Sequence, residues 1–154
     1  MSVFLADEQS EDLDLPRLRS LAELVLAEES YPDGTEVTLL FVKDDEMAAY
    51  NSRFLERSGP TDVLAFPVEE LIPGVVPETD PNGPPLVIGD VIVAPSYVRR
   101  QAKEYEVSMD DEISLMVIHG ILHLLGYNHE DDESASRMEG REAEVLGMVG
   151  KVRR

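Results

Sequence analysis

The feature that most constrains the fold is the segment from Ser108 to His129, in which a long apolar helix leads into a cluster of histidines. Ser108 is a favourable N-cap residue, and the acidic residues 110–112 follow it in the first turn, where the helix dipole favours negative charge. Apolar residues continue to Leu124, and Gly126 has the conformational freedom that commonly ends a helix. We therefore expect a helix here that stops near Gly126.

All three histidines of the chain lie in this segment, at His119, His123 and His129. His119 and His123 are four residues apart, so on a helix their side chains share one face and lie about 6 Å apart. His129 would point away from them if the helix continued. A turn at Gly126 can bring it back, and the spacing therefore predicts that the three imidazoles bind one metal ion.

The ligand set indicates which metal and which kind of site to expect. The chain has no cysteine, and three imidazoles without a thiolate suit zinc, with nickel, copper or iron as alternatives. Three protein ligands leave a fourth position for water, which is typical of catalytic zinc. Water bound there has its pKa lowered to about 7.

The histidine spacing is shared with the metzincin proteases, whose pattern is HExxHxxGxxH. Their glutamate is the general base, but this chain has Gly120 at that position. Glycine has no side chain that could accept a proton, so a protease is the less favoured interpretation.

The rest of the chain alternates between strand and helix patterns. We expect helices that begin after Asp14 and after Asp44 or Asp45, and two more over residues 94–105 and 132–148. Strands are expected over residues 3–6, 36–42, 62–66 and 86–93. Residues 67–85 contain six prolines and two glycines, which predicts a long irregular loop. No repeat or linker divides the chain, so residues 1–154 are expected to form a single domain.

The net charge of −19 argues against a generic nucleic-acid binder, because such proteins have basic surfaces. Residues 47–103 are nearly balanced, with 7 acidic and 5 basic side chains, so an anionic substrate should bind near them and the metal. We select Lys43 and Arg57 as substrate-binding candidates, with Arg53 as a further basic side chain. No residue stands out as a general base.

The absence of cysteine, of an N-terminal signal-peptide pattern and of a long apolar segment is typical of a cytoplasmic protein with no membrane association.

Three sequence blocks resemble those of the YbeY family, the bacterial metal-dependent endoribonucleases. Residues 119–139, HGILHLLGYNHEDDESASRME, are similar to the family pattern HGxLHLxGYDHxxxxxxxxME. Residues 51–67, NSRFLERSGPTDVLAFP, and residues 88–95, IGDVIVAP, resemble two further family elements. Their order and spacing also agree, so the resemblance extends over most of the chain.

The chain departs from the family pattern at three positions. Leu55 stands where the family usually has an arginine that is thought to meet the RNA phosphate, and Arg57 is the nearby candidate to replace it. Ala65 replaces the serine of the family's LSFP. Asn128 replaces an aspartate before the third histidine, so this position can still form hydrogen bonds but has no charge.

The resemblance implies an α/β (α+β) fold in which a mixed sheet of about four strands packs with about five helices, the histidine helix being central. It also implies a zinc-dependent endoribonuclease that cuts single-stranded ribosomal RNA in small-subunit 3′-end maturation and ribosome quality control. Partners would be ribosomal small-subunit proteins or assembly factors. Two alternatives remain: a zinc metalloprotease-like hydrolase, and a non-catalytic ribosome assembly factor with a structural metal.

Overall fold

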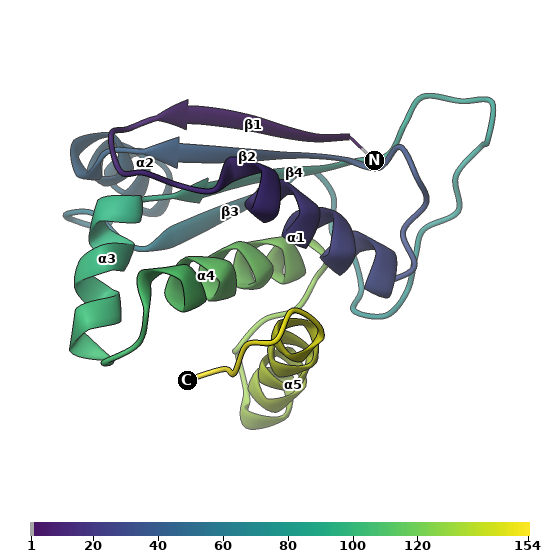
Figure 1. Ribbon diagram of the computed structural model, residues 1–154. Coiled ribbons are helices and arrows are strands. Elements are labelled where there is room, and N and C mark those ends of the chain that lie inside the picture. The colour runs from purple at the N-terminus through teal and green to yellow at the C-terminus, as the bar shows by residue number, and fades with distance from the viewer. Residues whose placement is uncertain (1) are drawn as a thin grey trace.

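The computed structural model describes residues 2–154 and consists of one four-stranded sheet with five helices around it (Figure 1). The strands are β1 (Ser2–Glu8), β2 (Glu36–Val42), β3 (Val63–Pro67) and β4 (Val87–Val93). The helices are α1 (Leu15–Glu28), α2 (Asp44–Leu55), α3 (Pro95–Glu104), α4 (Met109–Leu124) and α5 (Asp132–Met148). This is the mixed α/β architecture that the sequence predicts.

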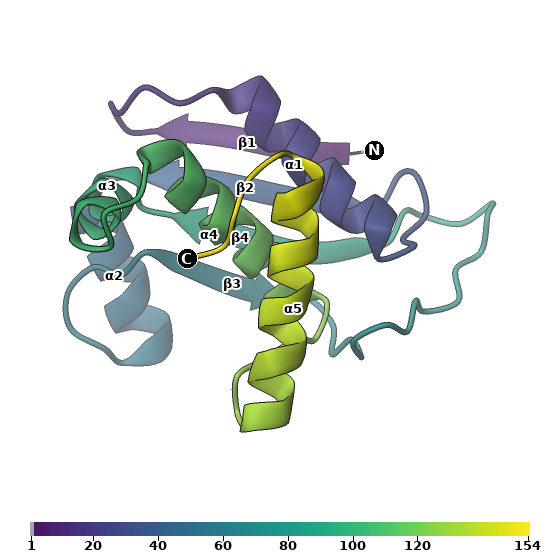
Figure 2. The same cartoon turned by 60° about the horizontal axis from the view of Figure 1, so that its bottom comes forward.

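The sheet has the order β1-β2-β4-β3, with β3 antiparallel to β4 and the other pairs parallel. Alternate residues of each strand point to opposite faces. Leu39, Phe41 and Val91 face the main core with α1 and α4, whereas Ile92 and Leu64 face a smaller core under α2. The two faces of the sheet are therefore covered by different helices, with α1 and α4 on one side and α2 on the other (Figures 1 and 2).

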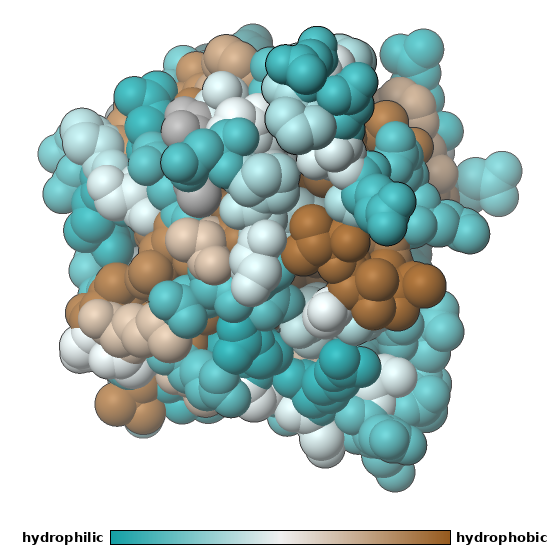
Figure 3. Space-filling model, turned by 90° about the vertical axis from the view of Figure 1, so that its right-hand side faces the viewer, coloured by the Kyte–Doolittle hydropathy of each residue, from teal (hydrophilic) through white to brown (hydrophobic). Residues whose placement is uncertain are grey.

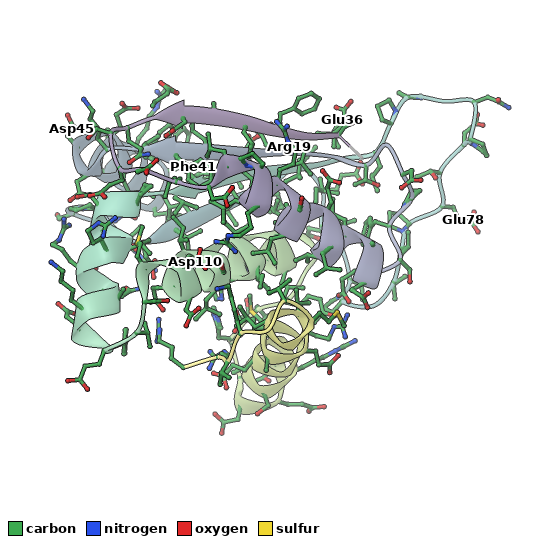
Figure 4. The ribbon with its side chains drawn as sticks, in the orientation of Figure 1. Arg19, Glu36, Phe41, Asp45, Glu78 and Asp110 are labelled. Carbon is green, nitrogen blue, oxygen red and sulfur yellow. The ribbon has the colours of Figure 1, made fainter. Side chains whose placement is uncertain are left out.

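Helix α4 is the central helix of the main core. Its residues from Glu112 to Ile118 are all buried, and it packs against the sheet, α1, α3 and α5. Ser108 caps it as expected, since its hydroxyl accepts a hydrogen bond of 3.0 Å from the Asp111 N–H. Asp110 lies at the exposed start of the helix (Figure 4). It forms ion pairs with Arg17 of α1 and with Lys151.

The start of helix α2 differs from the prediction. It begins at Asp44 with Lys43 in the N-cap position, so neither Asp44 nor Asp45 is the cap. Both acidic side chains lie instead in the first turn, where the helix dipole stabilises them. The helix ends at Leu55, because Glu56 adopts a left-handed conformation with φ of 54°.

The long irregular segment that the sequence predicts begins at residue 68, because Pro67 is still paired in β3, and it contains one isolated bridge between Ile72 and Val75. The segment extends outward, and Glu78 projects from its outer part (Figure 4). Val68, Ile72 and Val75 are exposed on it, and hydrophobic residues gather in patches on this side of the molecule (Figure 3). Between residues 2 and 154, no helix is long and apolar enough to cross a membrane.

Candidate active site

The three histidines meet at the C-terminal end of α4. Their ring centroids are 5.8 Å apart for His119 and His123, 5.7 Å for His123 and His129, and 4.8 Å for His119 and His129. Three imidazoles around a tetrahedral ion with metal–nitrogen distances of about 2.0–2.1 Å would have centroids about 5 Å apart. The backbone therefore brings the rings to the separation that a shared ion requires.

The return of His129 depends on Gly126, which has a φ of 103°. The Tyr127 N–H donates to the Leu122 carbonyl at 3.1 Å, which closes the helix end and turns the chain back. A Cβ atom at Gly126 would also collide with the Leu71 carbonyl of the long loop. Glycine is therefore required here by both the backbone conformation and the close approach of the loop.

The imidazole nitrogens do not yet form a complete set of ligands. Among residues 2–154, no group of three or more His, Cys, Asp or Glu side chains has the arrangement of a finished metal site. Centroid distances depend on the backbone and χ1, whereas the direction of each nitrogen also depends on χ2. The number, chemistry and separation of the rings thus fit a metal ion.

Glu142 of α5 orients one of these rings. Its Oε2 atom lies 2.7 Å from Nδ1 of His119, and its side chain is only 1% exposed. An Nδ1–H that donates to this carboxylate leaves Nε2 free as the ligand atom. Local sequence does not reveal Glu142 as a partner of the histidines, because 23 residues separate it from His119.

The C-terminal segment stabilises the same carboxylate. Arg153 donates through Nε to Oε1 of Glu142 at 3.0 Å. The next residue, Arg154, donates through Nε to a different buried carboxylate, that of Glu112, at 2.7 Å. Burial raises the pKa of the Glu142 carboxyl, but the hydrogen bonds and charges of His119 and Arg153 outweigh burial and lower it overall. Glu142 is therefore ionised at neutral pH and can accept both hydrogen bonds.

The pKa of His123 is also lowered, by burial first and then by the neighbouring imidazoles of His119 and His129. A lower pKa keeps His123 neutral at pH 7, and the neutral imidazole is the form that binds metals.

A pocket of about 350 Å³ opens beside His119 and His123. It is lined on its other side by Leu55 at the end of α2, by Arg57 and Asp62 of the connection that follows, and by β3. Arg57 thus lies in the same pocket as two of the histidines. Among the described residues that line this pocket, Asp62 supplies the one carboxylate.

Asp62 is held by its surroundings. Its Oδ1 accepts from the Val63 N–H at 2.7 Å, and its Oδ2 accepts from the Gln101 amide at 3.2 Å. It also lines a smaller pocket with His119, Glu142 and Arg153. Asp62 lies in the block of residues 51–67 that resembles a family element, but local sequence assigns it no role.

Lys43 lies elsewhere. It precedes α2, which packs on the opposite face of the sheet from α4, and it is not among the lining residues of the histidine pocket. The geometry thus favours Arg57 over Lys43 as the phosphate contact, a distinction that depends on the packing of α2 and not on local sequence.

Asn128 has a local structural contact. Its side-chain oxygen accepts from the Glu130 N–H at 3.0 Å, which shapes the turn that carries His129. On that side of the histidines, a second groove is lined by the long loop and by acidic residues Glu69, Glu70 and Glu130.

Comparison with known proteins then identifies the family. Residues 4–150 match the sequence profile described as "Endoribonuclease YbeY". The chain belongs to the YbeY family of endoribonucleases. A YbeY endoribonuclease of Acidothermus cellulolyticus is 40% identical over 147 residues, covering 95% of this chain and 90% of the relative. One from Thermobifida fusca is 38% identical over 95% of this chain and 92% of its own length.

A solved structure also supports the fold. The solution structure of a Thermotoga maritima protein superposes with a TM-score of 0.62 at 27% sequence identity, and the match covers 96% of this chain and 91% of that one. The resemblance to the YbeY family and the predicted fold class are thereby confirmed, and the chain is a member of a family of RNA-cleaving enzymes.

Proposed function

We propose that this protein is a zinc-dependent endoribonuclease of single-stranded RNA, with His119, His123 and His129 as the metal ligands. The observation that carries the proposal is the meeting of three imidazoles at one end of α4, beside a pocket that contains Arg57. Zinc is the metal that best suits three nitrogen ligands, although another divalent transition metal would fit the same donors.

The side chains around the histidines have separate roles in this proposal. When bound, the metal supplies Lewis acidity toward phosphoryl oxygens and a water of lowered pKa. Glu142 holds His119 with Nε2 toward the ligand position. Arg57 holds a phosphate of the substrate, because phosphoryl transfer requires the charge on its oxygens to be neutralised.

We assign Asp62 as the candidate general base. In hydrolysis, the water oxygen would bond to phosphorus, the bond from phosphorus to the leaving ribose oxygen would break, and Asp62 would take the proton of the attacking water. The leaving oxygen would take a proton from solvent. Asp62 has one hydrogen bond to Oδ2, so this atom retains a lone pair for the proton.

The biological substrate that we propose is the 3′ region of small-subunit ribosomal RNA, in maturation and ribosome quality control in the cytoplasm. The support is the family resemblance together with the charge of the chain. A net charge of −19 repels naked RNA but complements basic ribosomal proteins, so ribosomal proteins or assembly factors would bring the enzyme to its substrate.

An RNA cleavage assay with and without a chelator tests the proposal. We expect the purified protein to cut a single-stranded oligonucleotide, to lose this activity in chelator and to regain it with added zinc. His123→Ala should abolish cleavage, and Asp62→Asn should lower kcat by about 10²–10⁴-fold, the usual contribution of a general base.

Matched arginine variants test the substrate contact. Arg57→Ala should weaken binding of single-stranded RNA, whereas Arg17→Ala should not, because Arg17 of α1 is paired with Asp110 of α4. Lys43→Ala would weaken binding only if RNA also reaches the α2 side of the sheet.

Intact RNA together with chelator-sensitive cleavage of casein would favour the protease alternative. Metal binding without any cleavage would favour the assembly factor.

A further inference from the structure

An exposed aromatic surface lies on α2, just outside the histidine pocket. It is a concave pocket of about 260 Å³ lined by Glu46, Ala49, Tyr50, Arg53 and Phe54, which we call the aromatic pocket. Phe54 is 52% exposed, although phenylalanine is a residue that proteins usually bury. Neither the fold nor the chemistry proposed above requires an exposed phenylalanine here.

The Phe54 ring is held in place by its neighbours. Its centroid lies 6.1 Å from that of Tyr50 in a stacked arrangement and 5.4 Å from that of Phe66 in an edge-on arrangement. The Arg53 guanidinium lies 5.2 Å from the same ring. These contacts fix the ring while half of its surface stays open, so a planar group could stack there without first ordering a mobile side chain.

The aromatic pocket lies next to the histidine pocket along the chain, although the two share no lining residue. Leu55 follows Phe54 at the end of α2 and lines the histidine pocket. Phe66, which contacts Phe54, follows Ala65 of that pocket on β3 and faces the other side of the sheet, because alternate strand residues point to opposite faces. Strand β3 is an edge strand of the sheet, and Figure 2 shows it beside α2. A strand of RNA held at the histidines could therefore pass over this edge and reach Phe54.

The charges of the aromatic pocket indicate what it would bind. Glu46 and Arg53 line it together, so one negative and one positive charge offset each other. A phosphate would be repelled by Glu46, whereas an uncharged aromatic ring would not. Aromatic and arginine side chains around an open ring face are the usual means of holding the bases of single-stranded RNA.

We propose that the aromatic pocket binds a nucleobase of the same RNA strand that is cut at the histidines, by stacking the base on Phe54. This inference rests on the proposed function and extends it, because it gives the enzyme a second contact beyond the scissile phosphate. A base flexible enough to leave its neighbours occurs in single strands and not in a duplex, so the pocket accounts for single-strand specificity.

Phe54 can be tested with a closely matched control. Phe4 lies on β1, at the opposite edge of the sheet, and is also 52% exposed. With a fluorescein-labelled single-stranded oligonucleotide in chelator, Phe54→Leu should weaken binding by about 5- to 150-fold, the range expected for loss of one stacked base. Phe4→Leu should leave the affinity unchanged, and thermal unfolding of both variants should show that they are folded.

Two further measurements separate stacking from charge. Phe54→Leu should leave the slope of log K against log salt unchanged, whereas Arg57→Gln should flatten it by about 0.7, the value for one phosphate contact in a single strand. The chain has no tryptophan, so Phe54→Trp introduces a unique indole. Its fluorescence should be quenched by single-stranded RNA and not by duplex RNA, and this variant should bind at least as tightly as the wild type.

The outcomes are distinguishable. If the wild type cuts and binds RNA but Phe54→Leu matches Phe4→Leu, the stacking proposal is wrong and the proposed function stands; such a result would point to a protein partner at this surface. Equal quenching of the Phe54→Trp indole by duplex RNA would also overturn it. If the wild type neither binds nor cuts RNA, the proposed function and this inference fail together.

Discussion

At the scale of single residues, Glu142 is the side chain that links the histidine site to α5 and to the C-terminal segment. It is buried, it receives a hydrogen bond from His119, and Arg153 holds its other oxygen. Glu142→Gln should lower metal affinity by about 10- to 100-fold, because the amide supports the His119 tautomer poorly. A chelator competition assay on the purified protein measures this directly.

The control for this variant lies on the same helix. Glu144 pairs with Arg141, and its side chain is 58% exposed. Glu144→Gln should leave metal affinity unchanged and alter the free energy of unfolding by less than about 1 kcal/mol. Equal metal affinity in Glu142→Gln and the wild type would show that Glu142 has only a structural role.

The lowered pKa of Glu142 also predicts how the free energy of unfolding falls at acidic pH. Its folded-state pKa is lowered below the ordinary value of 4.5 for a glutamate, so the folded state binds fewer protons than the unfolded chain in that range. Its contribution is therefore fully present above pH 4.5 and is lost as the pH falls through the lower folded-state value. In urea unfolding of the metal-free protein below pH 4.5, Glu142→Gln should show a smaller loss of stability with acid than the wild type.

At the scale of elements, the contact of α4 with the sheet depends on Gly120. A Cβ atom there would lie 2.5 Å from Cγ1 of Val91 and 3.2 Å from Cγ2 of Val63. Gly120→Ala should therefore destabilise the protein by about 1–3 kcal/mol through overpacking, although alanine is the better helix former. The glycine that occupies the glutamate position of the metzincin pattern is thus a packing requirement of this fold.

Gly140 of α5 provides the opposite case. A Cβ atom there meets nothing within 4 Å, and its backbone is helical. Gly140→Ala should stabilise the protein by about 0.5–1 kcal/mol, because it lowers the entropy of the unfolded chain without a clash. Chemical denaturation of Gly120→Ala and Gly140→Ala measures the change in the free energy of unfolding for each. If Gly120→Ala were as stable as the wild type, α4 would be able to shift away from the sheet.

The C-terminal segment is a second element that helps to hold α4. Arg154 bonds both oxygens of Glu112, a side chain that is 1% exposed, and stacks over Tyr105 at 3.7 Å. Arg154→Ala leaves this buried carboxylate with Gln101 as its remaining side-chain partner, at 2.8 Å, and should cost about 1–3 kcal/mol in the free energy of unfolding.

The exposed pair between Arg100 and Asp44 is the matched control for this ion pair. The Arg100 side chain is 53% exposed, so Arg100→Ala should change stability by less than about 1 kcal/mol. In a double-mutant cycle, Glu112→Gln should remove most of the cost of Arg154→Ala. Additive effects would show that the two side chains are not energetically coupled.

At the scale of the whole molecule, the net charge of −19 should give salt opposite effects on folding and on RNA binding. Salt screens the self-repulsion of the acidic surface, so Tm should rise between low and moderate ionic strength. RNA affinity should fall over the same range, with a shallow slope of about −0.7 to −2, because few phosphates are contacted. A steep slope would mean that RNA contacts a basic surface larger than the one around Arg57.

Much of this protein follows from local sequence. The structure gives β2 and α5 the bounds that hydrophobic periodicity and capping predict, and Asp14 and Ser108 cap their helices as expected. The clustering of the histidines is local as well, since a four-residue helical spacing and one glycine turn bring the three rings together. Contacts between residues that lie within about ten positions of one another in the sequence can be predicted without the tertiary fold.

The surroundings of the histidines depend instead on how distant segments pack. Which face of the sheet α2 covers decides that Arg57, and not Lys43, reaches the histidine pocket. Glu142 and Arg153 become partners of the site because α5 and the C-terminal segment fold back along α4. Such long-range pairings are selected by burial and by the need to satisfy buried charges, and neither is visible in the periodicity of a single segment.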